Sequence, residues 1–134
     1  MTDNDKQRER IAYWLSVAQY DLDTAETVLR GGRLLYVGFM CQQVIEKALK
    51  ASYVLHCGGT PPYSHNLGYL GRECGLYQRL SEDQKAFLDR LEPLNIESRY
   101  PDHKKRVLDG LTQEWCEGLL MQTKELYTWL RALL

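Results

Sequence analysis

The sequence predicts an all-α protein, an up-down bundle of four to five helices with an antiparallel helical hairpin at its centre. Apolar residues recur at spacings of three and four along nearly the whole chain, and no stretch alternates cleanly between apolar and polar residues. Glycine or proline pairs separate the periodic stretches. A chain of 134 residues, 44% of them hydrophobic, is long enough to bury one core, so we expect a single domain over residues 1–134.

The first two predicted helices form the hairpin. The first runs from about residue 6 to 30 and stops at Gly31 and Gly32, since glycine often ends helices. The second runs from about residue 34 to 56. A connection of only a few residues forces the two helices to be antiparallel. Their predicted buried faces are Ile11, Trp14, Ala18, Leu22, Ala25 and Leu29 on the first, and Val37, Cys41, Val44, Ile45, Ala48, Leu49 and Ser52 on the second.

The second half of the chain predicts shorter helices. Pro61 and Pro62 exclude helix from the loop that follows the hairpin. A short helix is expected over residues 66–77, capped by Ser64 or Asn66. The remaining elements are a helix that starts at a capping box of Ser81 and Gln84 and is kinked or divided at Pro93, and a last helix that starts near Thr112.

Composition excludes several classes of function. Seventeen Lys and Arg against 18 Asp and Glu give a net charge of -1, which excludes capture of nucleic acid by the whole surface. The chain has no apolar run long enough for a transmembrane helix and no signal peptide, so the expected compartment is the cytoplasm. The spacing of its cysteines and histidines matches no metal site, and we expect neither a metal nor a cofactor.

The second predicted helix has a continuous polar face opposite its apolar one. This face consists of Gln42, Gln43, Glu46, Lys47 and Lys50. One interpretation is a solvated surface on which Glu46 and Lys50 form an i,i+4 ion pair. The other is the polar wall of a groove that binds a ligand. Spacing alone favours the solvated surface.

A basic segment, residues 98–106, is the second candidate for chemistry. It contains four basic residues and only one acidic residue, Asp102. The basic residues are Arg99, Lys104, Lys105 and Arg106. Arginine binds phosphate oxygens with two parallel hydrogen bonds, and Tyr100 and His103 add a phenol and an imidazole. The alternative is a solvated basic loop with Arg99 paired to a carboxylate.

His65, in the sequence PPYSHNL, is interpreted as a residue at a helix start that hydrogen-bonds the backbone.

Four motifs in order resemble the prokaryotic HEPN domain family, in its RYPD-containing and nucleotidyltransferase-associated form. These motifs are W-x3-A-x2-D-L-x2-A from Trp14, CQQVIEKALKA over residues 41–51, P-x2-S-H-N-L ending at Leu67, and SRYPD over residues 98–102. The resemblance covers the chain from about residue 11 to its end. It implies a helical bundle that commonly forms a homodimer. Many members are encoded beside a small nucleotidyltransferase in toxin–antitoxin-like pairs, and others are metal-independent ribonucleases.

The resemblance also implies the site residues. Ribonuclease members carry an arginine, four to six residues and then a histidine, whereas three residues separate Arg99 from His103. That shorter spacing favours the branch assigned to nucleotide binding and partner docking. The implied site consists of Arg99, Tyr100, Asp102 and His103, with Gln43, Glu46, Lys47 and Lys50 as the opposite wall.

Two functional hypotheses follow, beside a helical domain without a ligand. The first is a homodimeric module that binds the phosphate of a nucleotide or RNA at Arg99–Arg106 and pairs with a nucleotidyltransferase. The alternative is an endoribonuclease in which His103 takes the proton of the RNA 2′-hydroxyl and Arg99 stabilises the charge that develops on phosphorus.

Overall fold

The computed structural model describes residues 2–97 and 109–134, and these residues form helices and no strand. The all-α prediction is therefore confirmed for them. The basic segment, residues 98–106, lies outside the described residues. The helices are α1 (Asp3–Arg30), α2 (Leu34–Cys57), α3 (Leu67–Glu73), the 3-10 helix η1 (Tyr77–Arg79), α4 (Glu82–Leu91), α5 (Leu94–Glu97) and α7 (Gln113–Ala132).

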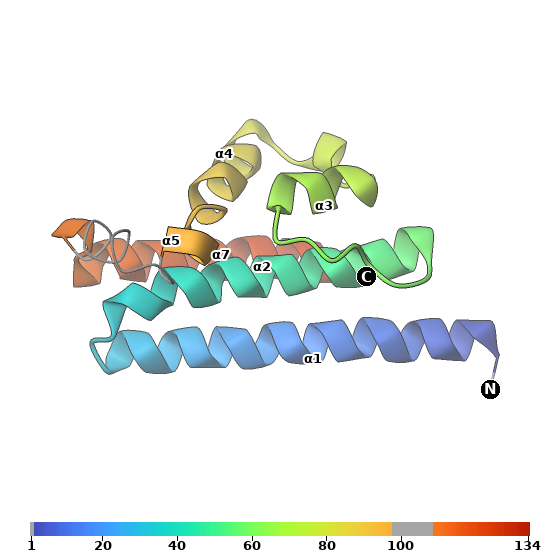
Figure 1. Ribbon diagram of the computed structural model, residues 1–134, viewed down its shortest axis with the longest axis horizontal. Coiled ribbons are helices and arrows are strands. Elements are labelled where there is room, and N and C mark those ends of the chain that lie inside the picture. Colours follow the sequence, from blue (N-terminus) through green and yellow to red (C-terminus); the bar gives the residue numbers. More distant parts are fainter. Residues whose placement is uncertain (1, 98–108) are drawn as a thin grey trace.

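Helices α1 and α2 form the predicted antiparallel hairpin (Figure 1). A capping box starts α1, since the Thr2 hydroxyl accepts from the Asp5 backbone N–H and the Asp5 carboxylate accepts from that of Thr2. Gly32 has a φ of +73° in the turn, a conformation that glycine adopts without strain. The turn therefore reverses the chain within three residues, between Arg30 and Leu34.

Helix α2 lies at the centre of the molecule. It packs against α1 on one side and against α3 and α5 on the other, while α7 lies alongside it (Figure 1). Helix α7 runs in the same direction as α2, because Cys116 lies next to Leu34 and Leu134 lies next to Leu55. The predicted apolar face of α2 is buried along its whole length. A helix with neighbours on several sides also buries much of its polar face.

The connecting helices differ from prediction in one place. The short helix expected over residues 66–77 ends at Glu73, because Gly75 takes a φ of +78°, and a separate 3-10 turn follows. Asn66 is the cap. The capping box of Ser81 and Gln84 is confirmed, and the chain breaks at Pro93 into α4 and α5.

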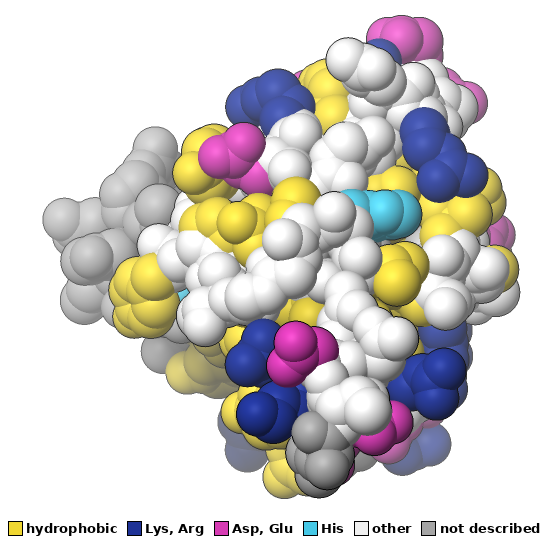
Figure 2. Space-filling view, turned by 90° about the vertical axis from the view of Figure 1, so that its right-hand side faces the viewer, with side chains coloured by type: hydrophobic (Ala, Val, Ile, Leu, Met, Phe, Trp, Pro, Cys, Tyr) yellow, Lys and Arg dark blue, Asp and Glu magenta, His cyan; other side chains and the backbone are white. Residues whose placement is uncertain are grey.

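Charges of both signs are mixed on the surface. At the end of the molecule drawn in Figure 2, Lys and Arg side chains alternate with Asp and Glu, without a large patch of one sign. None of the described helices is both long and apolar enough to span a bilayer.

Candidate functional site

The polar side chains of α2 converge on a buried cluster in the middle of the fold. We call Gln42, Gln43, Glu46, Lys47, Lys50, His65 and Asn95 the polar cluster. The interpretation of this face as a solvated surface is wrong, because the loop before α3 and helix α5 cover it. Its predicted i,i+4 pair does form, with 3.3 Å between Lys50 Nζ and Glu46 Oε2.

Glu46 is the hub of the polar cluster. Its side chain is 0% exposed, and both carboxylate oxygens accept hydrogen bonds. His65 Nδ1 lies 2.7 Å from Oε1, which also accepts from Gln42 at 3.3 Å. Lys47 Nζ and Lys50 Nζ lie 3.0 and 3.3 Å from Oε2. A buried carboxylate with this many donors is satisfied on both oxygens.

These donors keep Glu46 ionised. Burial alone raises the pKa of the Glu46 carboxyl, but the charges of Lys47 and Lys50 and the hydrogen bonds from His65 and Lys47 outweigh burial and hold that pKa below its ordinary value. A carboxylate without a proton only accepts hydrogen bonds, so the proton between Glu46 and His65 sits on Nδ1. Nε2 of His65 then points away from Glu46 on a side chain that is 40% exposed.

Helix α1 adds an acid and an aromatic ring to the surroundings of the cluster. The pKa of the Asp21 carboxyl is above its ordinary value, mainly because of burial. The charge of Lys47 lowers this pKa, and the charge of Glu46 raises it. Lys50 Nζ lies 5.4 Å from the centre of the Trp14 ring, a cation–π contact. Two motif residues of the first helix thus contribute to the surroundings of the predicted wall.

Helix α5 joins the polar cluster to the basic segment. Gln43 Nε2 donates to Asn95 Oδ1 at 3.2 Å and to Gln42 Oε1 at 2.7 Å, while Lys47 donates to Gln43 Oε1 at 2.8 Å. Asn95 is buried. The described chain stops two residues later, at Glu97. The predicted site residues Arg99, Tyr100, Asp102, His103, Lys104, Lys105 and Arg106 all lie beyond that point, outside the described residues.

The loop before α3 is fixed by short-range hydrogen bonds and by α2. Gln42 Nε2 donates to the His65 carbonyl at 3.1 Å. The Ser64 hydroxyl accepts from the Asn66 backbone N–H, and the Asn66 side chain accepts from the Tyr69 N–H. Pro61 is buried. These contacts hold His65 over Glu46, although 19 residues separate the two in the chain.

Sequence reasoning placed five of the seven residues of the polar cluster on one face of the second helix and missed the role of the other two. Those five residues come together in a buried cluster, and their role as the wall of a ligand site stays a prediction. The imidazole of His65 binds a buried carboxylate, so its assignment as a backbone-bonded helix start is wrong for the side chain. No motif or spacing around Asn95 in the sequence indicated that it would join the cluster. The only sequence signal for His65 was its place in the P-x2-S-H-N-L motif.

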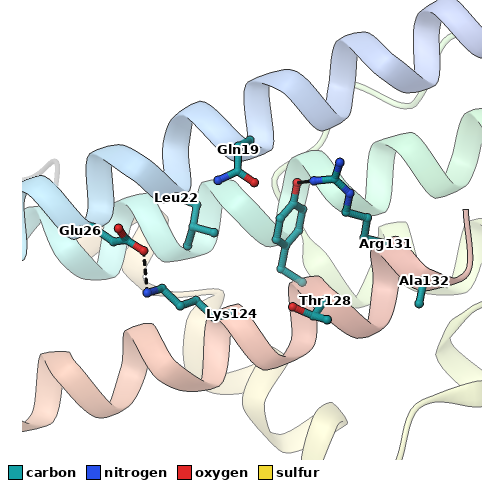
Figure 3. A pocket seen from close by; sticks show the side chains of 8 residues that line it. Gln19, Leu22, Glu26, Lys124, Thr128, Arg131 and Ala132 are labelled. Atoms are coloured by element: carbon teal, nitrogen blue, oxygen red, sulfur yellow. Dashed lines mark hydrogen bonds and ion pairs between the residues drawn. The ribbon is translucent and has the colours of Figure 1, made fainter.

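A hollow of about 580 Å³ lies between α1 and α7, away from the polar cluster (Figure 3). Its cations already have partners: Lys124 Nζ lies 2.6 Å from Glu26 Oε1, and Arg131 donates to the Tyr127 hydroxyl at 3.3 Å. It shares no residue with the polar cluster. Among the described residues, no group of His, Cys, Asp or Glu is arranged to hold a metal ion.

Comparison with known proteins identifies the family. No curated protein and no solved structure gives a significant match. Residues 11–133 match the HEPN domain. Since the match spans nearly the whole sequence, including both arms of the hairpin and the polar cluster, the chain belongs to the HEPN domain family.

Proposed function

We propose that this HEPN domain binds the phosphate of a nucleotide or RNA between the polar cluster and the basic segment, and that it works as an interaction module. Family membership supports a nucleotide- or RNA-related role. The observation that carries the proposal is the ionised Glu46, which is buried on the central helix and is bound by Lys47, Lys50 and His65. Buried ion pairs contribute little net stability compared with apolar residues of the same volume, so such a cluster indicates a functional site.

Chain length supports the placement of Arg99 beside this cluster. Asn95 is hydrogen-bonded to Gln43, and Arg99 follows it by four residues. Four extended residues span at most about 14 Å. A chain segment of this length is short enough to allow the long Arg99 side chain to reach the α2 wall, as the proposal requires.

Charge supports an anion as the ligand. Residues 98–106 contain four Lys or Arg and one Asp, in a protein of net charge -1. Each lysine at the wall also has donor capacity left. Lys47 uses two of its N–H groups on Gln43 and Glu46, and Lys50 uses one on Glu46. A phosphate group between the segment and the wall takes these donors.

A binding titration tests the proposal. Nucleotides and short single-stranded RNA are titrated at low and moderate salt, and binding should weaken as salt rises because phosphate contacts release counterions. Arg99→Ala should weaken binding more than the matched variant Lys104→Ala, since Arg99 is the closer of the two in the chain to the α2 wall. Absence of binding by the wild type at low salt would contradict the proposal.

A parallel assay addresses the ribonuclease alternative. RNA is incubated with the protein in chelator, and cleavage is followed for the wild type and for His103→Ala. The binding proposal predicts intact RNA. Robust cleavage that His103→Ala abolishes would replace it with the ribonuclease function.

We also propose that the partner is a small nucleotidyltransferase, in a toxin–antitoxin-like pair, and that the module is a homodimer. Exposed aromatic residues on the surface of α1 support a protein interface, because Tyr13 and Tyr20 are seven residues apart and share one face of that helix. Co-expression with a small nucleotidyltransferase of the same genome, followed by purification of a tag on one chain, tests the pairing. Recovery of the tagged chain alone would contradict it.

A further inference from the structure

The loop between α2 and α3 presents an aromatic ring and an imidazole side by side. The Tyr63 ring lies 5.9 Å from the His65 ring, centre to centre, at an interplanar angle of 61°. Tyr63 is 96% exposed. A ring exposed to this extent is open to contact with a ligand.

The loop is held in this conformation before any ligand binds. Gln42 anchors the His65 carbonyl, Glu46 anchors the His65 ring, and Pro61 is buried at the start of the loop. A loop that is already ordered loses little conformational entropy on binding. His65 is therefore preorganised, and the Tyr63 ring lies against it.

His65 Nε2 has no hydrogen-bond partner among the described residues, while Nδ1 is committed to Glu46. The protonated ring donates from both nitrogens, and a ring fixed through Nδ1 directs the second N–H outward. Lys47 lies on the next position of α2 after Glu46 and is 16% exposed. An anion that contacts Nε2 thus does not meet the Glu46 carboxylate, whose side chain is 0% exposed.

We propose that Tyr63 and His65 form a mononucleotide subsite, in which a base stacks on the Tyr63 ring and His65 Nε2 donates to the phosphate. The two rings are in edge contact, so a single nucleotide can touch both of them. Aromatic rings stack on every base, so the subsite accepts a nucleotide unit with little preference for sequence. This inference rests on the proposed function, because it specifies which part of the nucleotide or RNA ligand binds beside the polar cluster.

The ligand chemistry is shared by a free nucleotide and by one residue of single-stranded RNA. Binding of a labelled oligoadenylate is measured by fluorescence anisotropy at low salt, and unlabelled AMP is added as a competitor. Displacement by AMP assigns the subsite to free nucleotides, whereas binding of the oligonucleotide without displacement assigns it to RNA. Both outcomes support the subsite when the variants below respond as expected.

Tyr63→Ala should weaken binding about tenfold or more, and Tyr63→Trp should retain it because indole stacks at least as well. The fold is not at risk, since the side chain is exposed. Met121→Ala, which removes another highly exposed apolar side chain, on α7, is the control and should bind as the wild type does. Equal binding by Tyr63→Ala and the wild type would overturn the subsite.

The phosphate contact is tested at His65 itself. His65→Gln removes the ring that carries Nε2, so it should weaken binding of both AMP and the oligonucleotide. Thermal melts check that the variant is folded, because His65 also contacts Glu46. Equal binding by a folded His65→Gln variant and the wild type would contradict the assigned contact.

The outcomes separate the two proposals. If the wild type binds, Arg99→Ala weakens binding and Tyr63→Ala does not, then the proposed function stands and the subsite is wrong. If the wild type binds neither RNA nor AMP, the proposed function is wrong and the subsite with it.

Discussion

Glu46 stays ionised although it is completely buried, because its four donors offset the loss of water around the carboxylate. The same contacts mean that the two lysines need the Glu46 charge for their own stability. Without the Glu46 charge, Lys47 and Lys50 are two cations within one turn of α2, with no carboxylate between them. The stability of the fold and the charge state of the candidate site are thus coupled at one residue.

Glu46→Gln should lower the free energy of unfolding by about 3–5 kcal/mol, since removal of one partner leaves uncompensated buried charges. Urea denaturation measures the change. Glu82→Gln is the matched control, because Glu82 forms an ion pair with Lys85 while 92% exposed, and it should change stability by less than about 0.5 kcal/mol. A change in Glu46→Gln no larger than the control would contradict the role of Glu46 as hub.

The low pKa of Glu46 predicts an acid limit of stability. A carboxyl whose pKa is lower in the folded state than in the unfolded state stabilises the fold above its unfolded pKa, near 4.5, and this stabilisation is lost as pH falls below that value. The free energy of unfolding should therefore fall more steeply below about pH 4.5 in the wild type than in Glu46→Gln. Parallel curves for the two proteins, measured by urea denaturation at several pH values, would contradict this assignment.

At the scale of elements, local sequence patterns were enough to predict the helices. Contacts between residues far apart in the chain determine the structure of the polar cluster. The buried face of α2 follows from spacing, and the capping box of Ser81 and Gln84 needs only three residues of chain. Burial of the polar face was not predictable in the same way. This burial depends on segments that are distant in the chain. His65, in the loop before α3, contacts Glu46 across 19 residues, and Asn95, in α5, contacts Gln43 across 52 residues.

Two glycines inside helices allow a test of the packing around α2 and α7. Gly118 in α7 faces open space, so Gly118→Ala should stabilise the fold by about 0.5–1 kcal/mol through helix propensity. Gly38 in α2 lies against α5, where an added Cβ would come within 3.0 Å of Leu94 Cδ1. Gly38→Ala should therefore gain less than Gly118→Ala or lose stability. A larger gain for Gly38→Ala in thermal melts would show that α5 does not pack closely on α2.

At the scale of the whole molecule, charge gives no broad attraction for nucleic acid. The net charge is -1, and the face drawn in Figure 2 mixes both signs. Recognition of an anion must then come from a local arrangement. The sequence indicated the polar face of α2 and the basic segment as candidates for such an arrangement, but it could not show that the polar face of α2 is largely buried.

The protein should be a homodimer in solution. Its chain has a mass of 15.6 kDa, and light scattering at micromolar concentration should give about twice that value. Tyr13→Glu together with Tyr20→Glu should shift the mass towards that of one chain, because the two rings share an exposed face of α1 and charge there disfavours an interface. A wild-type mass near 15.6 kDa would contradict the dimer.

The central claim is that the α2 wall and the basic segment contact one ligand. A double-mutant cycle with Lys47→Met and Arg99→Ala, read out as the affinity for short single-stranded RNA at low salt, tests it most directly. Groups that contact the same phosphate are coupled, so the loss in the double variant should be smaller than the sum of the two single losses by about 0.5 kcal/mol or more. Thermal melts confirm that each variant is folded. Strictly additive losses, or a Lys47→Met variant that binds as the wild type does, would contradict a shared site.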